Sequence, residues 1–238
     1  MMLKGVGISK EFLRESRGTN RFFAVQETDI ALESGQMTVL MGRSGSGKST
    51  LLNMLAGLMQ PSSGRILLGD TDLYALSDKA LSRLRCEQIG VIPQGQTVLH
   101  SLNVVQNVCL PYTLYGEDAH EADARALLER LGIGALCDVK PADLSGGELR
   151  RVAIARAMLR KPAVLLADEP TADLDDENTE AVLGDLKQAA QDGAAVLVVT
   201  HETGAERFAD RLLRMNAGAL AEVSPADYKW GLRPQPPA

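Results

Sequence analysis

The chain has 238 residues, 45% hydrophobic and 24% charged, so it is long and apolar enough to bury one large domain core. Its formal net charge of −6 argues against nucleic-acid binding, which favours a basic surface. No apolar run approaches the ~20 residues that span a bilayer, and the first residues lack the apolar core of a signal peptide. We therefore expect a soluble protein whose membrane contact, if any, is made through a partner.

Residues 1–35 carry alternating apolar patches, which favour antiparallel strands beside a main sheet. Four later apolar runs have the length of strands, and their near-continuous apolarity is typical of parallel strands covered on both faces. These runs are 38–41, 89–92, 163–167 and 194–200. Helical patterns lie between them, for example at 49–58, 119–131, 149–160 and 178–191. The order predicts an α/β fold, with a mostly parallel sheet flanked by helices.

Residues 96–158 are rich in helical patterns and separate the second parallel strand from the third. We expect an inserted helical subdomain there, in a single domain at 1–229 whose core comprises 1–95 and 159–229. The Pro-rich segment 230–238 is expected to form an extended tail.

The segment 42–50 matches the phosphate-binding pattern G-x-x-x-x-G-K-[ST] and lies between an apolar strand and a helix. Its glycines permit a tight turn whose backbone N–H groups surround a phosphate. Lys48 can then reach the β- and γ-phosphates, and Ser49 can ligate Mg²⁺. The predicted nucleotide-binding residues here are Gly42, Arg43, Ser44, Gly45, Ser46, Gly47, Lys48, Ser49 and Thr50. The alternative is a glycine-rich turn with a purely structural role.

Asp168 and Glu169 directly follow the third apolar run. A carboxylate at this position can hold Mg²⁺, a role we assign to Asp168, and Glu169 can accept a proton from an attacking water. An isolated acidic pair would as often cap a helix, but the P-loop upstream favours the catalytic interpretation.

Polar groups stand at the carboxyl ends of all four predicted parallel strands. The P-loop follows the first strand, Gln94 the second, Asp168 and Glu169 the third, and His201 the fourth. Ligands of open α/β sheets bind beyond these strand ends, so we expect the four groups to converge on one site.

A further short segment, Leu144-Ser-Gly-Gly-Glu148, precedes a helical pattern. Its glycines leave the N–H groups at the start of the helix uncovered, and Ser145 can donate its hydroxyl to an anion. The residues alone leave two interpretations equally open, because Ser145 could also be a simple N-cap.

Together these motifs resemble the ATP-binding subunits of ABC transporters over nearly the whole chain. The matching segments are the Walker A loop at 42–50, the Q-loop at Gln94, the signature at 144–148, Walker B at 164–169, the D-loop at 171–175 and the switch histidine His201. The resemblance implies a P-loop NTPase fold with a RecA-like core, an N-terminal antiparallel β subdomain and an inserted α-helical subdomain. It also implies an ATP hydrolase that uses ATP and Mg²⁺.

The resemblance assigns roles to individual residues. The implied catalytic residues are Glu169, His201, Gln94 and Lys48. The implied metal ligands are Ser49, Gln94 and Asp168. The nucleotide held by the P-loop of a second copy would be contacted by Ser145, Gly146, Gly147 and Glu148 of this chain. Asp175 would shape the dimer contact. The aromatic that stacks on adenine, usually a tyrosine, matches Phe12 here, whereas Phe22 and Phe23 are expected to pack in the core.

The implied partners are a second copy of the chain, in a dimer around two MgATP, and transmembrane permease subunits. Nucleic acid is not expected. The implied location is the cytoplasmic face of the inner or plasma membrane, with attachment only through the permease. The segments 90–94, 106–111 and 166–175 resemble the branch that serves lipoprotein release, macrolide and peptide export and cell division.

Two other functions stay open at this point. An ATP-driven regulator could signal through a permease-like partner to an extracytoplasmic enzyme, and its sequence would look the same. A soluble ABC ATPase fits less well, because the chain has one P-loop, no heptad run and no cysteine pair.

Overall fold

The computed structural model describes residues 2–14, 20–95, 97–172 and 174–223, with the side chains of residues 14 and 20 left out. The tail at 230–238, predicted above, lies outside these residues. Within the described ranges, no helix combines the length and the apolarity that crossing a bilayer requires.

The main sheet has six strands in the order β10-β9-β3-β8-β7-β6. They are β3 (Met37–Met41), β6 (Ile89–Ile92), β7 (Val164–Asp168), β8 (Ala195–Thr200), β9 (Arg211–Asn216) and β10 (Ala219–Glu222). All are parallel except β10, which pairs antiparallel with β9 at the edge. Every residue of β7 and β8 is buried, which explains their unbroken apolar sequences.

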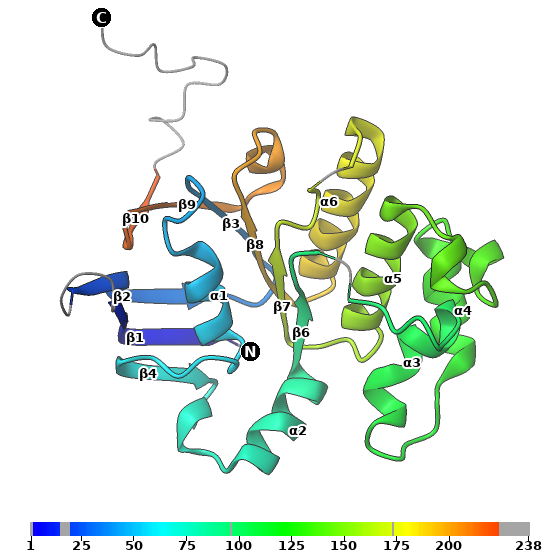
Figure 1. Ribbon diagram of the computed structural model, residues 1–238, viewed down its shortest axis with the longest axis horizontal. Coiled ribbons are helices and arrows are strands. Elements are labelled where there is room, and N and C mark those ends of the chain that lie inside the picture. Colours follow the sequence, from blue (N-terminus) through cyan, green and yellow to red (C-terminus); the bar gives the residue numbers. More distant parts are fainter. Residues whose placement is uncertain (1, 15–19, 96, 173, 224–238) are drawn as a thin grey trace, which may run out of the picture.

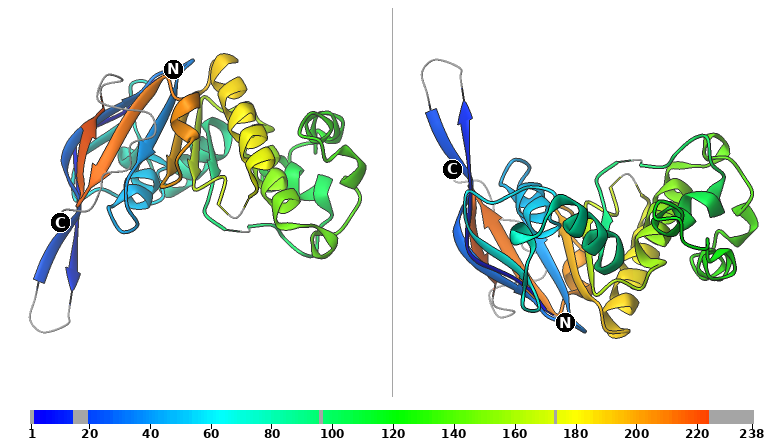
Figure 2. Two further views of the ribbon diagram at one scale, coloured as in Figure 1. Left: turned by 90° about the horizontal axis from the view of Figure 1, so that it is seen from above. Right: turned by 90° about the horizontal axis from the view of Figure 1, so that it is seen from below.

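A second, antiparallel sheet has the order β2-β1-β4-β5. Its strands are β1 (Leu3–Arg14), β2 (Asn20–Leu32), β4 (Ser63–Leu68) and β5 (Thr71–Asp72). The pairing of β1 with β4 ends at Ser9, whereas its pairing with β2 continues to Arg14. The far end of the β1–β2 hairpin therefore projects from the body of the protein (Figure 2).

The helices are α1 (Lys48–Leu55), α2 (Asp78–Gln88), α3 (Val104–Thr113), α4 (Glu121–Arg130), α5 (Gly146–Met158) and α6 (Asp176–Gln191), with short 3₁₀ turns η1 (Leu73–Ala75), η2 (Gly134–Leu136), η3 (Pro141–Asp143) and η4 (Ala205–Phe208). One apolar core joins α1 and the antiparallel sheet to one face of the main sheet. The other core joins the opposite face to α5 and α6 and continues into α3 and α4. Figure 1 shows the antiparallel sheet at one end of the molecule and α3 with α4 at the other.

The predicted elements are present, with differences at their ends. The helix predicted to run to Leu58 stops at Leu55, because Gly57 has a φ of +70° and ends the helical path. The helix predicted from Leu149 begins at Gly146, because Ser145 caps it one turn earlier.

Candidate functional site

The P-loop occupies the turn between β3 and α1. Gly47 is the N-cap of α1 and has a φ of +107°, in the left-handed region. A Cβ atom on Gly47 would lie 2.0 Å from the carbonyl oxygen of Ala24, so both conformation and space require glycine. Lys48 is buried, and its Nζ donates to the carbonyl oxygens of Gly42 (2.7 Å) and Arg43 (3.2 Å). The ammonium is thereby held at the mouth of the loop, where a phosphate would bind.

A cavity of about 540 Å³ opens over this loop. It is lined by Phe12, Phe22, Phe23, Ala24, Ser44, Gly45, Ser46, Gly47, Lys48, Ser49, Thr50, Gln94, Glu169, His201, Ala217 and Gly218. The structure thus brings together groups that follow β3, β6, β7 and β8, as the strand-end pattern predicts. Gly42 and Arg43 lie behind the cavity, where their carbonyl groups bind Lys48.

The carboxylate of Glu169 contacts both Lys48 and His201. Its Oε1 lies 2.8 Å from Nδ1 of His201 and 3.9 Å from Nζ of Lys48, and its Oε2 accepts the backbone N–H of His201 at 3.3 Å. Its φ of +48° is left-handed, a conformation that costs a non-glycine residue about 1–3 kcal/mol. Its N–H donates to Val199 O (2.8 Å), and its carbonyl oxygen accepts from Arg150 (3.1 Å) and from the N–H of Ala172 (3.3 Å).

Asp168 lies beneath the cavity and fits a divalent cation. Its Oδ1 is buried and accepts no hydrogen bond from the described residues. The carboxyl group nevertheless has a side-chain hydrogen bond with Ser49. Burial raises the pKa of Asp168, and the bond from Ser49 offsets this only in part. Among the described residues there is no cluster of three His, Cys, Asp or Glu that could cage a metal by itself. That suits Mg²⁺, which takes few protein ligands together with waters and phosphate oxygens.

The aromatic residues of the hairpin form one wall of the cavity. The rings of Phe12 and Phe22 are stacked, with centroids 5.8 Å apart and planes at 27°, and the ammonium of Lys10 lies 5.4 Å from the centre of the Phe12 ring. Phe22 is 37% exposed and Phe23 is 53% exposed. The prediction that these two pack in the core is therefore wrong, because the hairpin projects past Ser9, where its pairing with β4 ends.

The signature segment stands apart from this cavity. Ser145 is the N-cap of α5 and forms a capping box with Glu148, whose carboxylate accepts the N–H (2.7 Å) and the hydroxyl (2.8 Å) of Ser145. These two bonds lower the pKa of Glu148. Of the described residues that line the cavity, none belongs to 145–148, so the chain does not join its own P-loop to its own signature.

Asp175 is likewise outside the cavity and caps α6. Its carboxylate accepts the backbone N–H of Asn178 at 2.8 Å, which lowers the pKa of Asp175. Asp173, in the middle of the predicted D-loop, lies outside the described residues.

Three contributors to the site belong to no sequence motif. Gly218 donates its N–H to Ser46 O (2.9 Å), and its neighbour Ala217 has a left-handed φ of +46°. Both come from the β9–β10 turn, which no motif marks. Arg150, discussed below, is the third.

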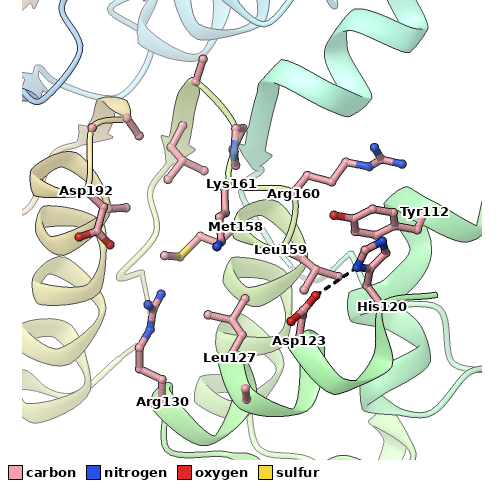
Figure 3. A pocket seen from close by; sticks show the side chains of 17 residues that line it. Tyr112, His120, Asp123, Leu127, Arg130, Met158, Leu159, Arg160, Lys161 and Asp192 are labelled. Atoms are coloured by element: carbon pink, nitrogen blue, oxygen red, sulfur yellow. Dashed lines mark hydrogen bonds and ion pairs between the residues drawn. The ribbon is translucent and has the colours of Figure 1, made fainter. Parts of the chain in front are cut away.

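A second cavity, of about 960 Å³, lies near the amino end of β7, between α4 and the last turns of α5 and α6 (Figure 3). Several of its charged groups already have partners. His120 lies 3.1 Å from Asp123, and the Tyr112 ring contacts both His120 (centroids 4.2 Å apart) and the guanidinium of Arg160 (4.0 Å). His120 thus takes part in a surface cluster, and no phosphate-binding loop lines this cavity.

Comparison with known proteins agrees with this geometry. Residues 25–172 match the family described as ABC transporter. The lipoprotein-releasing system ATP-binding protein LolD of Shewanella sp. (strain MR-7) is 42% identical over 201 residues, which cover 83% of this chain and 87% of that protein. The macrolide export ATP-binding/permease protein MacB 1 of Aeromonas hydrophila is 38% identical over 239 residues, which cover 100% of this chain and 36% of that protein.

A solved structure is also similar. It is the dimeric post-hydrolysis state of the ATP-binding cassette MJ0796, bound to ADP and Pi, with a TM-score of 0.84 and 29% identity over 92% of this chain and 98% of that one. The predicted fold class, a P-loop NTPase with antiparallel β and helical subdomains, is confirmed. The chain belongs to the ABC transporter family, as one of its ATP-binding and ATP-hydrolysing subunits.

Proposed function

We propose that two copies of this chain close around two MgATP molecules and so drive an associated membrane permease of the export or extraction type. The observation that carries this proposal is the division of the site. Lys48, Glu169 and His201 meet at one cavity, while Ser145 and its glycines stand outside it at the amino end of α5. A second copy would supply the missing half.

In this proposal the P-loop backbone and Lys48 bind the phosphates, and Phe12 with Phe22 contacts the adenine. Glu169 orients the attacking water and accepts its proton, because its carboxylate lines the cavity 3.9 Å from Nζ of Lys48 and 2.8 Å from Nδ1 of His201. His201 and Gln94 contact the γ-phosphate side of the cavity. Ser49 and Asp168, with Gln94 nearby, would hold Mg²⁺, which would neutralise phosphate charge there.

The partner's Ser145, Gly146, Gly147 and Glu148 segment would contact the γ-phosphate from the other side. Ser145 then donates its hydroxyl to the phosphate in place of Glu148. Loss of the γ-phosphate removes these contacts, and the dimer opens. We further propose that residues 96–158 move as the helical subdomain against a core of 1–95 and 159–229, with Asp175 contributing to the dimer contact.

The permease would bind the helical subdomain on the cytoplasmic side of the membrane. Leu99 and Leu114 support this, since they flank α3 and are 49% and 74% exposed. Similarity to LolD and MacB supports the export branch, with the cargo set by the permease. Leu114→Asp should abolish co-purification with the permease subunits, and unchanged co-purification would contradict this surface.

The central test is Glu169→Gln. This variant keeps the shape of the side chain but cannot accept the proton, so ATP should bind, trap a dimer in size-exclusion chromatography and turn over at least about 100-fold more slowly. Steady-state hydrolysis at the wild-type rate would refute the role of Glu169. Failure to form an ATP-dependent dimer would refute the shared site.

A further inference from the structure

Arg150 lies two residues after the signature, in the first turns of α5. It is only 8% exposed, and its guanidinium reaches two other parts of the site. It donates to the carbonyl oxygens of Pro93 (2.9 Å) and Gly95 (3.5 Å), on either side of Gln94. It also donates to the carbonyl oxygen of Glu169 at 3.1 Å. One side chain thus joins the signature helix, the Q-loop and the proposed catalytic base.

Burying a permanently charged guanidinium is costly unless it gains bonds that a neutral side chain could not make. Arg150 meets this condition, because its planar fork serves acceptors on two separate loops. Its charge also favours the ionised form of Asp168 and so opposes the effect of burial on the pKa of that carboxyl. An apolar residue would fill this space but would leave the three carbonyl groups without this donor.

The bond to Glu169 acts at a strained point of the backbone. Glu169 has a φ of +48°, and the peptide group that Arg150 holds directly follows it. The N–H of the same residue is fixed to Val199 in β8. The carbonyl oxygen of Glu169 also accepts the N–H of Ala172 at 3.3 Å. One peptide is therefore held by the sheet and the next by both Ala172 and α5, so a shift of α5 would act directly on the peptide that follows Glu169.

We propose that Arg150 is a positioning residue that makes the orientation of Glu169 and Gln94 depend on the signature helix of the same chain. This inference rests on the proposed dimer. There, the signature helix contacts the nucleotide of one site while Glu169 serves the other. Arg150 therefore carries the state of the first nucleotide to the catalytic base acting on the second, and the two sites hydrolyse ATP cooperatively.

Arg156 provides a matched control on the same helix. It is partly buried, and over the described residues its hydrogen bonds go to Thr97, through the carbonyl (2.7 Å) and the hydroxyl (2.6 Å). It fastens α5 to the segment after the Q-loop but holds neither Glu169 nor the carbonyl groups beside Gln94. Loss of packing alone should affect both arginines in the same way.

The test compares Arg150→Gln, Arg150→Lys and Arg156→Gln in the full chain. Arg150→Gln should lower kcat at least about tenfold and bring the Hill coefficient for ATP close to 1, while monomer affinity for a fluorescent ATP analogue stays within about twofold. Arg150→Lys should recover part of kcat, because an ammonium reaches one of the carbonyl groups but not all three. Arg156→Gln should keep kcat within about threefold and retain cooperativity.

Two results would overturn the inference: an Arg150→Gln enzyme with wild-type kcat and Hill coefficient, or equal losses in Arg150→Gln and Arg156→Gln. If Arg150→Gln does not fold, as judged by circular dichroism, Arg150→Lys decides by itself through a fall in kcat without a change in KM. Dimer formation by Glu169→Gln, with and without Arg150→Gln, separates the two proposals. Loss of the dimer in Glu169→Gln alone refutes the shared site, whereas an intact dimer together with unchanged kinetics in Arg150→Gln refutes only the role of Arg150.

Discussion

The fully buried side-chain amide of Asn107 holds the loop that follows the Q-loop. Its Oδ1 accepts the N–H of Leu99 at 2.7 Å. Its Nδ2 donates to the carbonyl oxygens of Leu99 (3.0 Å), Leu102 (3.3 Å) and Asn103 (3.0 Å). Asn107→Ala removes all four contacts at once, including the acceptor of the Leu99 N–H, while the carbonyl oxygens of Leu99 and Asn103 keep their backbone donors. We expect it to destabilise the protein markedly.

The magnitude follows from these contacts. Each buried hydrogen bond contributes about 1 kcal/mol net, and two amide hydrogens are shared among three carbonyl groups, so we expect a loss of about 3 kcal/mol. At about 2–4 °C per kcal/mol for a chain of this size, Tm should fall by about 6–12 °C. Urea titration followed by circular dichroism measures the free energy of unfolding directly.

The control is Thr113→Ala on the same helix, where an exposed hydroxyl bonds only Leu110 O in the described structure. It should change the free energy of unfolding by less than about 0.5 kcal/mol. If Asn107→Ala lowers the free energy of unfolding by less than about 1 kcal/mol, the argument is refuted, since water would then replace the amide without cost. If both variants lower the free energy of unfolding by about 3 kcal/mol, the effect would come from a general destabilisation of α3 rather than from this amide.

Three further predictions concern the site itself. Lys48→Ala should weaken ATP binding by at least about tenfold in a fluorescent-nucleotide titration, because the ammonium that faces the phosphates is lost; unchanged affinity would contradict its placement. Gly47→Ala should abolish ATP binding, since its Cβ would lie 2.0 Å from Ala24 O, whereas Gly45→Ala, with nothing within 4 Å of its Cβ, should bind ATP more weakly but measurably. Asp168→Asn should raise Tm in the absence of nucleotide and Mg²⁺. Because burial raises the pKa of Asp168, the folded state holds a proton that the unfolded chain releases above about pH 4, so stability falls as pH rises through this window. The gain in Asp168→Asn should thus be larger near pH 7 than below about pH 4, and a gain independent of pH would refute this origin.

Much of the fold and the placement of the main site groups could be predicted from the sequence, because the information is local. Strands such as β7 are apolar throughout, and the polar residues that follow them must lie at the same edge of a parallel sheet. The strain at Glu169 has no such local mark, because its left-handed φ depends on bonds to Val199 and Arg150. The chemical roles of these residues stay predictions until the variants are measured.

What could not be predicted depends on contacts between distant segments. The exposure of Phe22 depends on where β4 stops pairing with β1, which no pattern in residues 10–25 records. Arg150 follows Leu149 in a helical pattern, where a charged side chain is usually solvated, and its acceptors lie 19 to 57 residues away along the chain. Helix α3 contains Pro111 in its last turn, which obscures its end.

The separation of the signature from the chain's own cavity has a consequence for mixed populations of subunits. If each nucleotide needs both copies, a subunit that lacks a working signature disables the site at the P-loop of its normal partner. With defective and normal subunits mixed equally and pairing at random, only about a quarter of dimers would hold two normal copies. A mixed dimer would keep one complete site and lose the other, so if the two sites hydrolyse ATP only together, activity would decline with the square of the normal fraction rather than in proportion to it.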